Sequence, residues 1–99
     1  MFLVRLEALP SDAIATRDGV IGAFVNCWVA TDDADEAESV ARNSVHEAGW
    51  HVVRIETRVP VSPDEERAPD EAERIQEALE RGGSMVFYEW GHDDEPIVG

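Results

Sequence analysis

The chain has 99 residues, a length that suits one domain with a single core and is too short for two independent cores. Apolar residues make up 43% of it and charged residues 30%, a balance typical of a folded globular protein rather than of a disordered one. With 22 acids against eight bases, the formal net charge of −14 repels phosphate backbones and anionic membranes. Direct binding of nucleic acid or of a membrane surface is therefore disfavoured, and a basic partner, or none, is expected.

The beginning of the chain lacks the pattern of a secretory signal, because Arg5 and Glu7 interrupt its apolar residues and no small-residue cleavage site follows. No apolar stretch approaches the roughly 20 residues that a membrane-spanning helix needs. The single cysteine, Cys27, has no partner for an internal disulfide. These features predict a cytoplasmic protein. The high content of acids is a separate matter, and two explanations stay open for it: a function, or the general composition of the host's proteins.

Two strands are predicted in the first third of the chain. Residues 1–9, "MFLVRLEAL", alternate with a period of two, as a strand with one apolar face does. Pro10, Ser11 and an Asp-Gly pair follow, which predicts a long or irregular hairpin loop before the next strand. Residues 20–30, "VIGAFVNCWVA", are apolar on both faces, so this strand suits the interior of a sheet or a face that a partner subunit covers.

The next stretch, "TDDADEAE" at residues 31–38, is read as the start of a helix. Asp33 followed by Glu36 has the spacing of a capping box, and acids suit the positive end of a helix dipole. Small apolar residues then recur with helical spacing up to Ala48. Gly49 is placed for a left-handed residue after the helix, with Trp50 packing back on Val45.

The second half of the chain predicts strand, helix and strand. Residues 51–61, "HVVRIETRVPV", form a strand with one charged face. Pro69 delays the following helix, which is expected from about residue 70 to 81 and ends at the Gly82-Gly83 pair. Residues 84–90, "SMVFYEW", form an aromatic strand, and residues 91–99 form an acidic, mobile tail.

The expected fold is a single α+β domain in the order β-β-α-β-α-β, a two-layer sandwich with both helices on one face of a four-stranded sheet. The other face would carry part of the aromatic set. Because a monomer seldom leaves such a patch exposed, we expect dimerisation through the sheet.

No catalytic, cofactor-binding or metal-binding residue is predicted. A calcium loop beginning at Asp33 fails, because Ala37 and Glu38 stand where an oxygen ligand and a glycine are needed. The cysteine and the three histidines, which are His46, His51 and His92, have no zinc-site spacing. Cys27 is expected to be a buried hydrophobe, and its use as a nucleophile with His51 as base is the less favoured alternative.

The chain resembles a class of short uncharacterised bacterial proteins. These begin with a strand, continue with an "NCW"-like strand and a helix ending in "AGW", and close with an aromatic strand after a helix that ends in glycine. The resemblance covers Phe2 to Trp90 and implies a ferredoxin-like α+β fold with no particular activity. The predicted order departs from that fold because two strands precede the first helix, which leaves the strand order open.

We therefore expect a non-enzymatic, acidic binding or regulatory domain that forms a homodimer through its sheet. The alternative is an immunity protein or antitoxin that inhibits a basic partner such as a nuclease. A small enzyme is the third and least favoured possibility. The residues expected to contact a partner lie in the acidic segment and among the aromatic residues: Asp32, Asp33, Asp35, Glu36, Trp28, Tyr88 and Trp90.

Overall fold

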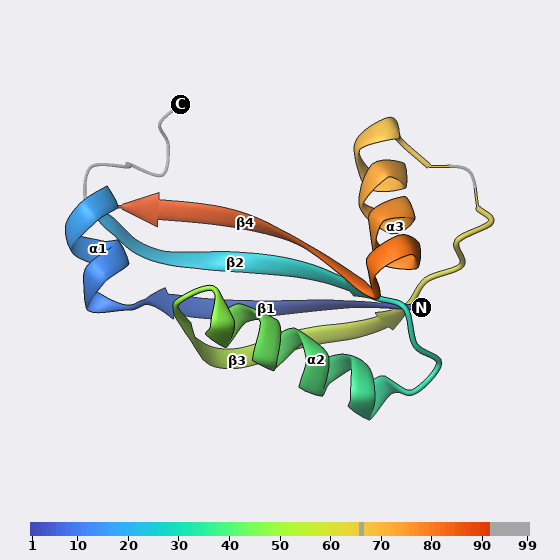
Figure 1. Cartoon of the computed structure of the whole chain (residues 1–99), viewed down its shortest axis with the longest axis horizontal. Coiled ribbons are helices and arrows are strands. Elements are labelled where there is room, and N and C mark those ends of the chain that lie inside the picture. Colours follow the sequence, from blue (N-terminus) through green and yellow to red (C-terminus); the bar gives the residue numbers. More distant parts are fainter. Residues whose placement is uncertain (66, 92–99) are drawn as a thin grey trace.

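The computed structural model of the chain describes residues 1–65 and 67–91 and is built around a four-stranded sheet (Figure 1). The strands lie in the order β3-β1-β2-β4, and all neighbours are antiparallel. This confirms the α+β class and the four strands, but the order along the chain contains a third helix. The elements are β1 (Phe2–Pro10), α1 (Asp12–Asp18), β2 (Val20–Val29), α2 (Ala34–Glu47), β3 (Trp50–Pro60), α3 (Pro69–Arg81) and β4 (Gly83–Gly91).

The strands β1 and β2 pair as an antiparallel hairpin, but the helix α1 stands where an irregular loop was predicted between them, so that part of the prediction is wrong. Ser11 caps the helix by accepting a hydrogen bond from the backbone N–H of Ile14. At the other end Gly19, with a φ of 68°, adopts the left-handed conformation and donates to the carbonyl of Ala15. Caps at both ends and the packing of Ile14 against the core hold two helical turns that the sequence pattern did not reveal.

The core lies between α2 and one face of the sheet. β2 pairs with β1 on one side and β4 on the other, which confirms its predicted interior place. Ala37, Ala41 and Val45 of α2 are fully buried, and their small size lets the helix lie close to β1 and β3. The strand residues that pack with them share one face: Val4, Leu6, Ala8, Ala23, Val25, Cys27 and Val29.

The C-terminal end of α2 forms as predicted, and Asp33 caps the N-terminal end. Glu36 does not complete the capping box, because the Asp33 N–H donates to the Thr31 hydroxyl instead. The Asp33 carboxylate accepts hydrogen bonds from the backbone N–H groups of Asp35 at 2.9 Å and Glu36 at 3.2 Å. After the helix, Gly49 has a φ of 96°, and the Trp50 side chain is buried in the same core cluster as Val45. The acidic stretch is therefore a helix N-terminus.

Removing the Asp33 cap should lower the stability of the fold. Asp33→Ala should lower the free energy of unfolding by about 1 kcal/mol, because two N–H groups lose their acceptor. Asp32→Ala is the matched control, since the neighbouring Asp32 side chain is fully exposed and caps nothing. Urea unfolding of the two variants checks this, and equal losses would contradict the capping role of Asp33.

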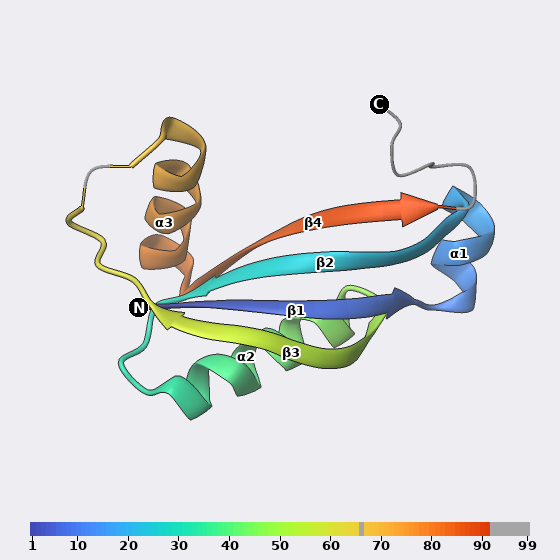
Figure 2. The ribbon, with the colours of Figure 1, turned by 180° about the vertical axis from the view of Figure 1, so that it is seen from behind.

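The two long helices lie on opposite faces of the sheet, so the prediction of both helices on one face is wrong. Ile75 and Ala78 of α3 pack with Leu3, Trp28 and Val86, which point away from α2. The reason is the path of the chain after β3, since Val61 joins this second cluster and its N–H donates to the carbonyl of Met1. Figures 1 and 2 show α2 lying across one face and α3 standing at the end of the sheet.

The two edges of the sheet differ in character. The outer strand β3 carries Arg54, Glu56 and Arg58 and ends in Pro60, features that discourage pairing with another chain. The other outer strand, β4, has Glu89 as its one charged residue. No helix within residues 1–65 and 67–91 is long and apolar enough to cross a bilayer. The predicted tail falls outside the described residues from residue 92 onward.

Candidate functional site

The face of the sheet opposite α2 is only partly covered, because α3 packs on one end of it. We call its uncovered part the open face and define it by Leu9, Phe24, Val59, Tyr88 and Trp90, with Arg5 and Asn26 at its centre. The exposed fractions are 41% for Phe24 and 55% for Tyr88, which face each other across β2 and β4. Large aromatic side chains with this degree of exposure on a sheet are typical of a surface that binds a ligand or another protein.

Trp90 forms the outer end of this aromatic group. Its ring lies over Gly22, where an added Cβ would come within 2.5 Å of the ring. The ring centroid is 5.2 Å from that of Phe24, with the planes tilted by 43°. Gly22 therefore leaves room for the indole to pack against the sheet and extend the apolar surface.

A polar pair sits in the middle of the open face. Asn26 is buried, and its Oδ1 accepts a hydrogen bond of 2.8 Å from Nε of Arg5, the residue opposite it in the register. Two hollows of about 530 and 420 Å³ adjoin the pair, and Arg5, Asn26 and Tyr88 line both. The hydrogen bond holds the guanidinium of Arg5 between the aromatic side chains of the open face and the acids that border it, which are Glu56 on one side and Asp70, Glu71 and Glu73 on the other.

Trp28, also expected to contact a partner, lies beneath α3 instead. Its side chain is 4% exposed and packs with Ile75 and Ala78. Within residues 1–65 and 67–91 its indole N–H has no hydrogen-bond acceptor. Of the three aromatic candidates, the structure brings Tyr88 and Trp90 together on the open face and places Trp28 in the second core.

The four acidic candidates lie at the start of α2, Asp32 and Asp33 in the loop before it and Asp35 and Glu36 in its first turn, at the other end of the sheet from Tyr88 and Trp90 (Figure 1). Three of them have local partners: Asp33 caps α2, Asp35 pairs with Arg58 at 3.0 Å, and Glu36 accepts a hydrogen bond from the Thr31 hydroxyl. The fourth, Asp32, has a fully exposed side chain, and its Oδ1 lies 4.0 Å from the N-terminal ammonium of Met1. The acidic and aromatic candidates are thus separate surfaces.

The structure opposes the use of Cys27 as a nucleophile. Its side chain is 1% exposed, and burial raises the pKa of the thiol to about 12. Cys27 pairs with Val4 whereas His51 pairs with Leu9, five residues farther along β1 and so roughly 16 Å away. The alternative in which His51 activates Cys27 is therefore wrong.

The histidines and acids form no metal site in the described part of the chain. The rings of His46 and His51 lie 6.4 Å apart, but no group of three or more His, Cys, Asp or Glu residues there could hold a metal ion. His92 falls outside the described residues.

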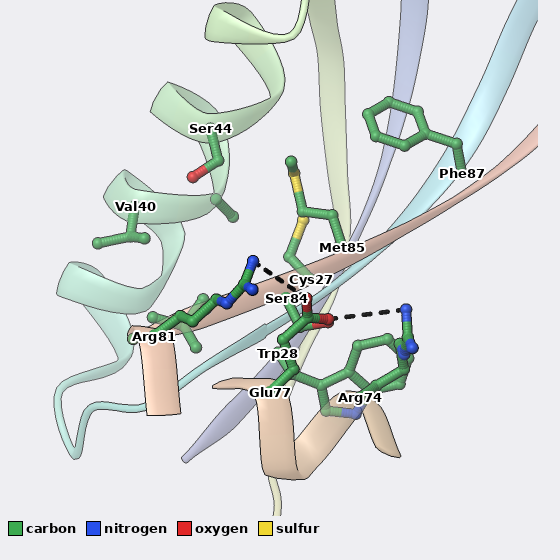
Figure 3. A pocket seen from close by; sticks show the side chains of 14 residues that line it. Cys27, Trp28, Val40, Ser44, Arg74, Glu77, Arg81, Ser84, Met85 and Phe87 are labelled. Atoms are coloured by element: carbon green, nitrogen blue, oxygen red, sulfur yellow. Dashed lines mark hydrogen bonds and ion pairs between the residues drawn. The ribbon is translucent and has the colours of Figure 1, made fainter. Parts of the chain in front are cut away.

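A third hollow lies on the other side of β4, between α2 and the end of α3, and sequence reasoning missed it. This α2–α3 cavity has a volume of about 610 Å³. Its apolar wall comes from α2 and from the sheet, whereas α3 contributes Arg74, Glu77 and Arg81 (Figure 3). These three residues have the spacing i, i+3 and i+7, which places them on one side of a helix. This spacing is the feature of the sequence that could have indicated the polar part of the cavity.

Glu77 is the centre of the polar part of this cavity. Its carboxylate accepts a hydrogen bond of 2.7 Å from the Ser84 hydroxyl. Nη1 of Arg74 lies 3.6 Å and Nη1 of Arg81 3.7 Å from its oxygens.

Comparison of the chain with protein-family models, with curated proteins and with solved structures gives no match, so function is inferred from these surfaces alone.

Proposed function

We propose that the protein is a small, acidic, non-enzymatic binding or regulatory domain that forms a homodimer through its open face. The observation that carries this proposal is the exposure of Leu9, Phe24 and Tyr88 on one flat face of the sheet. Burying these side chains removes apolar surface from water, at about 25 cal/mol per Å². Two copies related by a two-fold axis would set the same apolar patch against itself.

The distribution of charge supports a second copy of the chain as the partner that covers the open face. The chain carries a net charge of −14, so most approaches of one copy to another are repulsive. At the centre of the open face Arg5 offsets part of this charge, because the smaller hollow there is lined by Arg5, Phe24, Asn26 and Tyr88 with one acid, Glu56. Salt screens the long-range repulsion and leaves the apolar contact intact, so the dimer should become tighter as salt increases.

Light scattering coupled to size-exclusion chromatography tests the proposal. At tens of micromolar the native protein should have twice the 11.0 kDa mass of the chain. Raising salt from about 0.05 M to about 0.5 M should increase the dimer fraction on dilution, because the Debye length shortens. A monomer at every concentration and salt level would contradict dimerisation.

An acidic inhibitor of a basic protein is the second candidate. It is supported by Asp70, Glu71 and Glu73 of α3, which line the hollow beside Tyr88 and surround an aromatic surface with negative charge. Its affinity for a basic nuclease should fall as salt rises, the opposite of the homodimer. Salt-insensitive binding, or none, would exclude this candidate.

A further inference from the structure

We propose that the α2–α3 cavity is a binding site for a small amphipathic carboxylate, whose apolar body lies against the sheet and α2 and whose carboxylate binds Arg81. The cavity of about 610 Å³ has the size and the mixed lining of a small-molecule site. Leu9, Phe24 and Tyr88 of the open face do not line it, so this inference does not depend on dimerisation.

The apolar half of the site comes from three elements. β4 contributes Met85 and Phe87, both half-buried, and α2 contributes Val40, which is 37% exposed. Figure 3 shows these side chains around the cavity, and Cys27 and Val29 of β2 also line it. A half-buried methionine next to an aromatic ring adapts to hydrocarbon groups of different shape. A flexible alkyl chain therefore suits this wall.

The polar half carries one more positive charge than negative. Two guanidinium groups, of Arg74 and Arg81, share the carboxylate of Glu77, and neither comes within hydrogen-bond distance of it. Arg74 has a second acid at hand, since it donates a 3.4 Å hydrogen bond to Glu73. For Arg81 the one ion pair found in the described residues is the 3.7 Å contact with Glu77, and its side chain is 75% exposed. Arg81 is thus free to bind a second carboxylate.

The negative end of the α3 dipole repels an anion, but it weakens the binding of a carboxylate to Arg81 only in part. Gly82 donates to the carbonyl of Ala78 at 2.7 Å, and the carbonyl of Gly82 accepts from Ala30 at 3.0 Å. These bonds satisfy two of the carbonyl oxygens at the C-terminal end of α3, where the negative end of the helix dipole lies. A charge-assisted contact to a guanidinium is stronger than the residual dipole at this partly exposed position.

Titration with decanoate tests the inference. The chain has two methionines, and Met85 lines the cavity whereas Met1 packs on the opposite face. Decanoate should shift the ¹³C-methyl signal of Met85 in a saturable manner and leave that of Met1 in place. Decanol should bind at least about tenfold more weakly, and decylamine more weakly still, because each lacks the negative charge that Arg81 binds.

Matched variants separate the site from general effects. Arg81→Gln should raise the dissociation constant for decanoate about tenfold, whereas Arg42→Gln, which removes the same charge from an ion pair outside the cavity, should not. Val40→Phe should fill the cavity and weaken binding, and Ser39→Phe, on the same helix, should not. The inference is overturned by a Met85 signal that does not saturate, by equal affinity for decanol, or by equal effects of the two arginine variants.

Discussion

Replacing Tyr88 with aspartate is expected to convert the homodimer into a monomer. Tyr88 is the most exposed large apolar side chain of the open face, at 55%, and lies opposite Phe24. In a two-fold dimer the substitution acts twice, since each copy contributes one Tyr88, and it adds two negative charges to an interface between acidic chains. The dimer dissociation constant should rise at least about 100-fold, as for a central aromatic residue of an interface.

Leu79→Asp is the matched control for this prediction. Leu79 is 52% exposed on α3 and lies outside the open face, so the change again replaces an exposed apolar residue with an acid. Analytical ultracentrifugation of both variants, with circular dichroism to confirm folding, provides the measurement. A dimeric Tyr88→Asp variant, or equal dissociation of both variants, would place the interface elsewhere.

The stability of the fold should fall steeply at alkaline pH because of Cys27. Burial raises the pKa of this thiol to about 12 in the folded state, whereas a cysteine in the unfolded chain ionises near 8.5–9. Below pH 8.5 both states keep the proton and the contribution is fully present. As pH rises towards 12, the unfolded state loses its proton first, so the free energy of unfolding falls by about 1.4 kcal/mol per pH unit.

Comparison with Cys27→Ala isolates this effect. The chain has no lysine, so few other groups titrate in this range, and those that do are common to both proteins. Between pH 8 and pH 10.5, urea unfolding should show the native protein losing about 2–3 kcal/mol more than the variant. Identical pH dependence in the two proteins would show that the thiol is not shielded from water.

The elements that the sequence predicted well are those whose signals are local. The ends of α2 depend on Asp33 and Gly49, which act within one turn of the helix, and the Asp33 cap and the left-handed Gly49 form as expected. The interior place of β2 follows from apolar residues on both of its faces. α1 was missed although Ser11 and Gly19 cap it, because Pro10 and the Asp-Gly pair suggested a turn more strongly.

The arrangement of α3 could not be predicted from local signals. Its apolar stripe, including Ile75 and Ala78, fits either face of a sheet, and the choice depends on how Val61 packs after β3. The α2–α3 cavity depends on that choice in turn. In the sequence, Arg74 and Arg81 resemble any solvated helix charges, and only the fold brings them beside Met85 and Phe87.

The most direct test of the proposed interface is an isotope-filtered NOE spectrum of a dimer assembled from ¹³C-labelled and unlabelled chains. If the open face is the interface, intermolecular NOEs should connect the rings of Phe24 and Tyr88 and the methyl groups of Leu9 with protons of the partner. Intermolecular NOEs confined to α2 or to the outer edge of β3, with none from the open face, would contradict the proposed homodimer.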